Sequence, residues 1–372
     1  MNESFDFGII GGGVIGLSLA WKLSQRGRVI VVDRQEVGRE ASWAGAGILP
    51  PAVMDHAIHP REKLMALSFQ LHADWAKELK RESGIDTGYR CCGSAVVART
   101  SGELAALQGQ ILEWREDGIS VDTLSANQLV QQLHNLKPIK DQILAAAFLP
   151  QECQIRNPSH LQALKQGCLN RGVKFLEEQG TCRLISTKNA ISDVRTESGH
   201  RIQARRFAVT AGAWSAELVQ PLGIPISTIP VRGQMLLYKL SQPTFSPVIY
   251  EGTRYIAPRE DGHVLVGSTL EEAGFDKNTT EAGIKGLMDF AQGLVPELKP
   301  EYLANSWAGL RPASFDGFPY IGPAPQINNL WIGTAHFRSG LLLSTGTAEI
   351  MTRLLCDEAP PFDLAPFRVD RG

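Results

Sequence analysis

The sequence predicts an α/β protein of two units: one has a parallel sheet with helices, and the other is an α+β unit with a mostly antiparallel sheet. Two observations lead to this fold class. A strand, a glycine-rich turn and a helix follow one another early in the chain, whereas residues 231–269 form short alternating runs separated by turn residues. With 372 residues, the chain is long enough to form two domains with sizeable cores.

The first element is a short apolar strand at residues 7–10, which leads into a glycine-rich turn. Gly11, Gly13 and Gly16 match the pattern G-x-G-x-x-G. Apolar residues at helical spacing then continue to Gly27, which we expect to be the C-cap of the helix. The order of strand, turn and helix predicts a Rossmann-like unit in which the N-terminus of the helix binds a pyrophosphate.

A second strand at residues 29–32 ends in Asp33, about twenty residues after the glycines. A carboxylate at this point can accept hydrogen bonds from both ribose hydroxyls and repels a 2′-phosphate, so NADP is disfavoured. NAD and FAD both remain open at this stage. The next segment, residues 39–48, is rich in small residues. It either lets backbone amides approach a flat ring or forms an ordinary flexible loop.

The middle of the chain returns to alternating helices and strands. Helical periodicity predicts three helices, at residues 61–79, 103–114 and 161–170, the last of them opening at an N-cap near residues 157–159. A strand is expected at 173–176, and another at 206–210 that runs into a turn of small residues at 211–215. This turn would fit beside a dinucleotide.

The later part of the chain changes to strands. We expect them at residues 233–240, 255–258 and 264–267, the last two flanking a turn at 261–262, which indicates an antiparallel sheet. A final strand at residues 330–333 passes through a turn into a helix at 341–355. The N-terminus of that helix should face the ligand.

Charge and hydropathy exclude several classes of partner. The net charge of −2 gives no reason to expect a nucleic acid. No stretch approaches the roughly 20 apolar residues that span a bilayer, and the first residues lack a basic region typical of a signal peptide. We therefore expect a cytoplasmic protein that does not associate with membranes.

The cysteines show no pattern of a metal site or a disulfide framework. None of them has C-x-x-C spacing, and two are adjacent. We predict that all six are reduced and packed as small apolar residues: Cys91, Cys92, Cys153, Cys168, Cys182 and Cys356.

Six motifs occur in a fixed order along the chain. They are GGGVIG (11–16), SWAGAG (42–47), AGAWS (211–215), WAGLRP (307–312), DGFPYIG (316–322) and HFRSG (336–340). Together they resemble the D-amino-acid oxidase superfamily of FAD-dependent oxidoreductases, and within it they are most similar to the glycine oxidases of thiamine biosynthesis. The resemblance covers nearly the whole chain, and the joint order of the motifs carries it more than any single one.

The resemblance implies a discontinuous FAD-binding domain and an inserted substrate domain. The FAD-binding domain would comprise residues 1–84, 148–222 and 312–372. The substrate domain would comprise residues 85–147 and 223–311.

The resemblance also implies a set of residues around a noncovalent FAD, since no cysteine lies between residues 307 and 316, where covalent sarcosine oxidases attach the flavin. Asp33 and Arg34 should lie along the ADP part, Ser42 near the pyrophosphate and Thr181 near the adenine. The other expected contacts are Gly11, Gly13, Val14, Ile15 and Gly16 at the first turn, Ala46, Gly47 and Ile48 near the flavin ring, and His336, Phe337, Arg338, Ser339, Gly340, Leu341 and Leu342 at its pyrimidine edge.

For the substrate, the resemblance implies that Arg311 grips a carboxylate with its planar fork and that Tyr255 donates a hydrogen bond to it. Sequence physics alone would instead make Arg311 a surface ion-pair residue and Tyr255 a packing residue. Arg338 is a third candidate catalytic residue, through its side chain or only its backbone. His336 is either a base or a packing residue.

The implied activity is oxidative deamination of glycine or another small amine or D-amino acid. A hydride would leave the α-carbon for flavin N5, the imine would hydrolyse or supply thiazole synthesis, and dioxygen would be reduced to hydrogen peroxide. The resemblance further implies a homo-oligomer, such as a homotetramer, and thiazole synthase as a partner.

Four other functions remain open from the sequence. They are a D-amino-acid dehydrogenase that passes electrons to a quinone, a sarcosine oxidase-like secondary-amine oxidase, an NAD-dependent dehydrogenase, and a noncatalytic flavin-binding subunit. The absence of an evident amphipathic anchor disfavours the first, and the missing flavin-linking cysteine disfavours the second.

Overall fold

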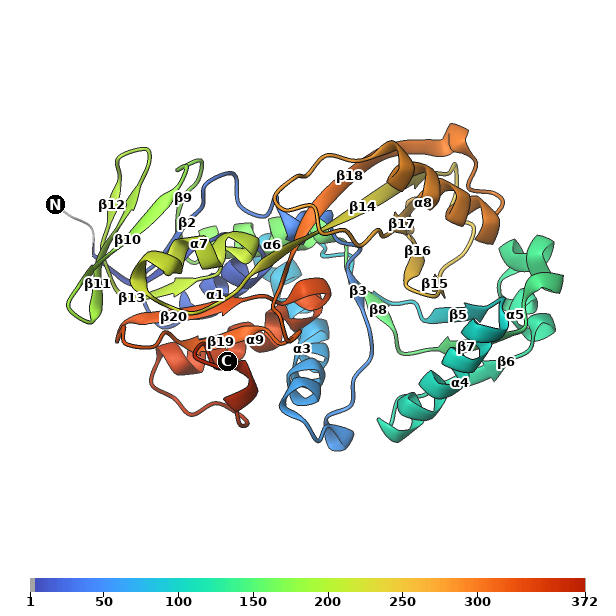
Figure 1. The fold of residues 1–372 in the computed structure, drawn as a ribbon, viewed down its shortest axis with the longest axis horizontal. Coiled ribbons are helices and arrows are strands. Elements are labelled where there is room, and N and C mark those ends of the chain that lie inside the picture. Colours follow the sequence, from blue (N-terminus) through green and yellow to red (C-terminus); the bar gives the residue numbers. More distant parts are fainter. Residues whose placement is uncertain (1–3, 372) are drawn as a thin grey trace.

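The structure is a computed structural model that describes residues 4–371, and two large sheets dominate it (Figure 1). The first is a six-stranded sheet whose neighbouring strands are parallel except at one edge, where β19 runs antiparallel to β20. Its strands, in spatial order, are β19 (Tyr320–Pro323), β20 (Leu330–Thr334), β13 (Ala204–Val209), β1 (Phe5–Ile10), β2 (Val29–Val32) and β9 (Lys174–Leu176). A parallel sheet of this kind is buried on both faces, which explains its apolar strands.

Helices cover one face of this sheet and a small sheet covers the other. The helices pack on one another and share one apolar core; they are α1 (Val14–Leu23), α3 (Pro60–Ser83), α6 (Asn157–Asn170) and α9 (Gly340–Leu355). The opposite face packs against α7 (Ser215–Val219) and the three-stranded sheet of β10 (Cys182–Thr187), β11 (Ala190–Thr196) and β12 (Arg201–Ile202). The carboxyl ends of β1 and β2 therefore remain available for a ligand.

The second large sheet has eight strands, and all its pairings are antiparallel except that of β5 with β15. In spatial order they are β18 (Leu303–Ala313), β14 (Ile229–Lys239), β17 (His263–Gly267), β16 (Arg254–Pro258), β15 (Val248–Glu251), β5 (Ser94–Ala98), β7 (Ala145–Leu149) and β6 (Asp122–Leu124). Figure 1 shows the long strands β14 and β18 running from this sheet toward the six-stranded one.

Shorter elements complete the structure around the two large sheets. Helices α5 (Ala126–Gln132) and α8 (Glu281–Leu294) share the core of the eight-stranded sheet, and α4 (Ser101–Glu116) packs on β5 and β7. A small sheet of β3 (Ile48–Leu49), β8 (Cys153–Gln154) and β4 (Arg90–Cys91) lies between the large sheets, and α2 (Ala41–Ala44) precedes it. The short 3-10 helices are η1 (Met54–His56), η2 (His134–Gln142), η3 (Gly212–Trp214), η4 (Gln220–Leu222), η5 (Pro300–Tyr302), η6 (Phe337–Ser339) and η7 (Ala365–Phe367).

Two predicted helix ends are wrong. Helix α1 ends at Leu23 with Ser24 as its C-cap, so Gly27 does not cap it. Gly27 instead allows a close approach, because a Cβ there would lie 2.7 Å from Oδ2 of Asp6. Helix α6 has Arg156 as its N-cap, while Asn157 is its first residue and uses its side chain elsewhere.

The prediction that all six cysteines are reduced is also wrong. Cys91 and Cys153 face one another in the antiparallel pair of β4 and β8, and their sulfurs are 2.03 Å apart in a disulfide. The register of β4 and β8 brings these two cysteines together, although they are 62 residues apart in the sequence. No spacing motif indicates the pair. The other four cysteines are free.

Residues 4–371 show neither a membrane-spanning helix nor a metal-binding cluster. No helix there is both long and apolar enough to cross a membrane. Nor does that part of the chain gather three or more histidine, cysteine, aspartate or glutamate side chains as a metal site.

Candidate active site

A cavity of about 1170 Å³ extends from the carboxyl ends of β1 and β2 to the eight-stranded sheet. Its walls include Gly11 and Asp33 at the first end and Tyr255 and Arg311 at the second. Pockets for small ligands usually measure roughly 300–1,000 Å³, so this one has room for a dinucleotide together with a small molecule.

The turn before α1 is built for close approach. A Cβ on Gly11, whose φ is +107°, would lie 2.6 Å from the Thr210 carbonyl oxygen, and one on Gly16 would lie 1.9 Å from that of Gly11. Helix α1 has Gly13 as its N-cap, without a capping side-chain bond, and the backbone N–H of Val14 donates to Oγ of Ser42 at 2.9 Å. The positive end of α1 thus faces the cavity, where it suits a pyrophosphate.

Asp33 stands at the end of β2 on the cavity wall. Its Oδ2 accepts a hydrogen bond from the Gly12 amide at 2.6 Å, and its Oδ1 accepts one from the Gln35 amide at 2.9 Å. Burial raises the pKa of this carboxyl, while the two amide hydrogen bonds oppose the shift. The carboxylate therefore has a fixed position from which it can accept the hydroxyls of a ribose.

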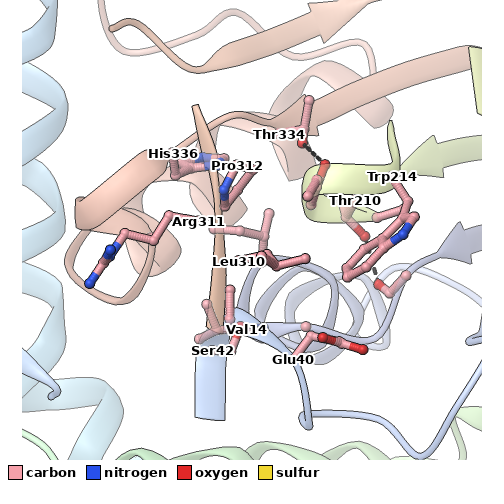
Figure 2. A pocket seen from close by; sticks show the side chains of 18 of the residues that line it. Val14, Glu40, Ser42, Thr210, Trp214, Leu310, Arg311, Pro312, Thr334 and His336 are labelled. Atoms are coloured by element: carbon pink, nitrogen blue, oxygen red, sulfur yellow. Dashed lines mark hydrogen bonds between the residues drawn. The ribbon is translucent and has the colours of Figure 1, made fainter. Parts of the chain in front are cut away.

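An aromatic and charged cluster closes the same end of the cavity. The Arg34 guanidinium lies 3.5 Å from the ring centroid of Trp214, and its Nη2 donates to Glu40 at 2.7 Å. Trp214 in turn stacks on Phe275, with ring centroids 5.4 Å apart. Figure 2 shows Trp214 and Glu40 on one side of the view and Arg311 on the other. Arg34 lies at the end of the cavity that the family resemblance implied, whereas no sequence motif indicated Glu40.

The segment expected at the flavin ring is held by three side-chain and backbone contacts. Asn157 donates through Nδ2 to the carbonyl oxygens of Ser42 (2.9 Å) and Gly45 (2.8 Å), and Arg259 donates to that of Ala46. At Gly47, where φ is +70°, a Cβ would lie 2.2 Å from Oδ1 of Asn157. The segment is therefore a fixed wall of the cavity and not a flexible loop, and no sequence motif indicated these contacts of Asn157 and Arg259.

Helix α9 directs its N-terminus into the cavity, as expected from the sequence. Residues 336–342 line the wall there, and the N-cap Ser339 makes no side-chain capping bond. His336 is buried, its Nε2 lies 3.0 Å from Oγ1 of Thr347, and burial lowers its pKa to about 3. The imidazole is thus neutral at physiological pH, and its low pKa makes it a weak proton acceptor.

Arg311 lies on β18 at the far end of the cavity and crosses the neighbouring strand at Gly233. A Cβ on Gly233 would lie 2.0 Å from Nη1 of Arg311, so only a glycine leaves room for the guanidinium. Nη2 donates to Oγ of Ser268 at 2.7 Å, and Nη1 donates to the Thr269 carbonyl at 3.2 Å. Within residues 4–371, no carboxylate oxygen lies within 4.0 Å of this guanidinium.

Tyr255 stands beside Arg311, and a second tyrosine packs on Tyr255. Burial raises the pKa of the Tyr255 hydroxyl, against the nearby charge of Arg311, and this hydroxyl lies 3.3 Å from Sδ of Met235. Tyr250 packs against Tyr255 with ring centroids 6.3 Å apart and also lines the cavity, although sequence reasoning missed it. Arg338 is exposed at the rim and donates to the Thr253 carbonyl at 3.3 Å. This end of the cavity therefore suits a small anion.

The cavity brings together nearly all the residues singled out from the sequence. Gly16 alone among them is not part of its wall, because it packs against Gly11 behind the turn. Lining residues outside that set include Glu40, Thr210, Trp214, Tyr250, Ser268, Leu310 and Pro312.

Comparisons with known proteins agree with this geometry. A family model described as "FAD dependent oxidoreductase" matches residues 6–354. The chain is 34% identical over 361 residues to a glycine oxidase of Pseudomonas putida, with 96% of each chain covered. It is 28% identical to the bifunctional protein ThiO/ThiG of a Synechocystis species, of which it spans 52%. The crystal structure of glycine oxidase from Geobacillus kaustophilus superposes with a TM-score of 0.91 at 28% identity and full coverage of both chains.

Proposed function

Because the chain belongs to the family of FAD-dependent oxidoreductases, we propose that it is an oxidase of glycine or another small amino acid. The observation that carries this proposal is Arg311, a half-buried guanidinium without an acidic partner among the described residues, directly beside the buried hydroxyl of Tyr255. Such a pair binds a carboxylate. The similarity to glycine oxidases supports the same substrate class.

The residues at the other end of the cavity fit FAD. Asp33 would accept the ribose hydroxyls, and the open N-terminus of α1 with Ser42 would hold the pyrophosphate. The segment from Ala46 to Ile48 and the N-terminus of α9 would flank the flavin, without a covalent bond. Bound FAD would supply the two-electron redox chemistry that oxidises the substrate and reduces dioxygen to hydrogen peroxide.

The chain itself contributes position and electrostatics. Arg311 and Tyr255 would fix the carboxylate of the substrate, and holding a reactant in one geometry can contribute about 7 kcal/mol or more. The N-terminus of α9 would stabilise negative charge beside it. His336 is a poor proton acceptor, since burial lowers its pKa to about 3.

The metabolic role, the partner, the oligomeric state and the location of the protein are also proposals. The likeness to half of a bifunctional protein ThiO/ThiG supports delivery of the imine to thiazole synthesis for thiamine, with thiazole synthase as partner. A homotetramer remains a prediction from the family resemblance, and a cytoplasmic location remains a prediction from the sequence.

We also propose the discontinuous arrangement of two domains. All strands of the six-stranded sheet fall within residues 1–84, 148–222 and 312–372, which would hold the cofactor. All strands of the eight-stranded sheet begin within residues 85–147 or 223–311, which would hold the substrate.

Peroxide release in air tests the proposed function. Purified yellow protein is supplied separately with glycine, sarcosine, D-alanine and ethylamine. We expect peroxide with at least one of the three amino acids and none with ethylamine, which has no carboxylate for Arg311. Peroxide from ethylamine at the same rate would overturn the role of Arg311, and reduction of the flavin without peroxide would indicate a dehydrogenase.

A further inference from the structure

A buried carboxyl group lies just outside the cavity. Glu152, between β7 and β8, is only 3% exposed, and its two oxygens accept hydrogen bonds from Oη of Tyr250 at 2.5 Å and Oγ of Ser94 at 3.0 Å. In the part of the chain that the structure describes, no lysine, arginine or histidine nitrogen comes within 4.0 Å of it. A buried carboxylate that only neutral hydroxyls hold is costly, so its proton is easily gained.

Tyr250 connects this carboxyl group to the cavity. Its ring lines the cavity wall next to Tyr255, whereas Glu152 is not part of that wall. The Tyr250 hydroxyl donates its hydrogen to Glu152, which leaves a lone pair on the same oxygen to accept another hydrogen bond. The geometry is therefore that of a two-residue chain from the substrate end of the cavity to a carboxyl group.

The proposed reaction releases a proton that such an acceptor can take. The amino group of a free amino acid is protonated at neutral pH, and it must lose one proton before a hydride can leave the α-carbon. His336 is neutral but has a pKa of about 3, and Arg311 carries its own charge. Burial raises the pKa of Glu152 to about 7, against the opposing hydrogen bonds of Tyr250 and Ser94. A base with a pKa near the working pH is the most effective one.

We propose that Glu152 accepts, through the hydroxyl of Tyr250, the proton that the substrate ammonium group loses. This inference rests on the proposed function. One N–H bond of the ammonium breaks and its proton binds Oη of Tyr250, while the phenolic proton passes to Oε1 of Glu152. Tyr250 ends unchanged, Glu152 becomes neutral, and the amine keeps its electron pair. No oxidant or second reactant is needed for this step.

Within its cluster of neighbouring groups, Glu152 is the group that we expect to titrate near neutral pH. Burial raises the pKa of the Cys92 thiol, which precedes β5, and those of Tyr250 and Tyr255 on β15 and β16, so all three keep their protons. Arg90 and Arg259 interact electrostatically with Cys92, but neither makes an ion pair with Glu152. Ser94 on β5 does not ionise. A change in activity with a midpoint near pH 7 would therefore report on Glu152.

The test compares the pH dependence of kcat/KM for glycine in the holoenzyme and two variants. In the natural protein, kcat/KM should fall as the pH drops through about 7, since protonated Glu152 accepts nothing. E152Q keeps a hydrogen-bond acceptor for Tyr250 but cannot take a proton, so it should lose this acid limb and about 100-fold in kcat/KM at pH 7.5. Y250F should show the same loss and serves as a second variant if E152Q folds poorly.

Ser94→Ala is the matched control. It removes the other hydrogen bond to the carboxylate and keeps the base, so the acid limb should persist and move to higher pH. A purely positioning role for Glu152 would leave the pH profile of E152Q unchanged, and that result would overturn the relay.

A second readout does not depend on turnover. Infrared difference spectra of the resting holoenzyme between pH 6 and 8.5 should show a protonated-carboxyl band that titrates near pH 7 and is missing in E152Q. A missing band in the natural protein would refute the relay. If the natural protein releases no peroxide with glycine, sarcosine or D-alanine, the proposed function fails and the relay with it. Peroxide release with an unaltered E152Q profile would refute the relay alone.

Discussion

At the scale of single residues, the substrate end of the cavity is set by a guanidinium that the protein holds with neutral partners. Ser268 and the Thr269 carbonyl orient Arg311, and Gly233 leaves the space across which it lies. None of these partners is an anion, so the positive charge of Arg311 remains available to attract a bound anion. Desolvation strengthens it, because interactions inside a dry cavity are less screened than in water.

The first prediction concerns Arg311→Ala. Removing two charge-assisted hydrogen bonds, each worth about 1.5–3 kcal/mol, should lower kcat/KM for glycine by roughly 100-fold or more. Steady-state peroxide release measures the effect, while flavin content should stay unchanged because Arg311 lies at the substrate end. Arg115→Ala, on the exposed face of α4, is the matched control and should have no effect. An R311A enzyme as active as the control would show that the carboxylate binds elsewhere.

At the scale of elements, two helix N-termini converge on one cavity. The N-terminus of helix α1 lies at Ser42, which accepts the Val14 N–H, and the N-terminus of helix α9 lies at the wall formed by residues 336–342. Asn157, at the start of α6, holds the segment between them through two carbonyl oxygens. These contacts within the protein hold the cradle in place, which would reduce the entropy lost when a ligand binds.

The second prediction concerns the contact of α1 with β1. In Gly16→Ala the added Cβ would lie 1.9 Å from the Gly11 carbonyl, so the helix must move and the protein should lose about 1–3 kcal/mol of stability together with FAD affinity. Urea denaturation and flavin content after gel filtration measure both. Gly109→Ala in α4 is the control, since nothing lies within 4 Å of its Cβ and alanine favours a helix by roughly 0.5–1 kcal/mol. Normal flavin content in G16A would contradict the assigned role of this turn.

Local elements were predictable where one stripe of apolar residues determines them. Helix α3 and helix α9 lie within a few residues of their predicted ranges, because each buries a regular apolar face in the same core. The predicted end of α1 was wrong because Gly27 allows a close contact with Asp6 and does not cap the helix. Periodicity reports what an element buries, not which distant atom approaches its ends.

Contacts between distant strands were beyond the sequence. The Cys91–Cys153 disulfide depends on the register of β4 and β8. The hydrogen bond from Tyr250 to Glu152 joins residues that are 98 positions apart in the sequence. Neither pair has a spacing motif. The glycine-rich turn and Asp33 could be predicted from the order of strand, turn and helix, whereas the other residues expected around the cofactor came from the family resemblance. The polar network behind the substrate end depends on the folded sheet.

At the scale of the whole molecule, burial of ionisable groups links stability to pH. Burial holds three histidines neutral, lowering the pKa of His72 to about 4 and those of His160 and His336 to about 3. In the unfolded chain they would take up protons below their usual pKa of about 6.5. Because the folded pKa is lower, their contribution is present above pH 6.5 and is lost as the pH falls toward 3.

The third prediction follows for His160. As the pH rises within that window, each such histidine adds roughly 1.4 kcal/mol to the free energy of unfolding per pH unit. Both ring nitrogens of His160 are buried without a hydrogen-bond partner, so His160→Leu should be at least as stable at pH 7 and should flatten the decline between pH 6.5 and 4. Urea denaturation at several pH values measures this. His56, an exposed histidine, is the control position. An unchanged slope in H160L would mean that His160 is charged or hydrated in the folded protein.

The most direct test of the central claim is anaerobic mixing of the yellow holoenzyme with glycine, sarcosine or D-alanine while the flavin absorbance is followed, with air admitted afterwards. The oxidase proposed here predicts that at least one of these amino acids bleaches the flavin, and that air restores the colour with one peroxide formed per flavin. Protein purified without flavin, or a flavin that stays oxidised with all three amino acids, would contradict it.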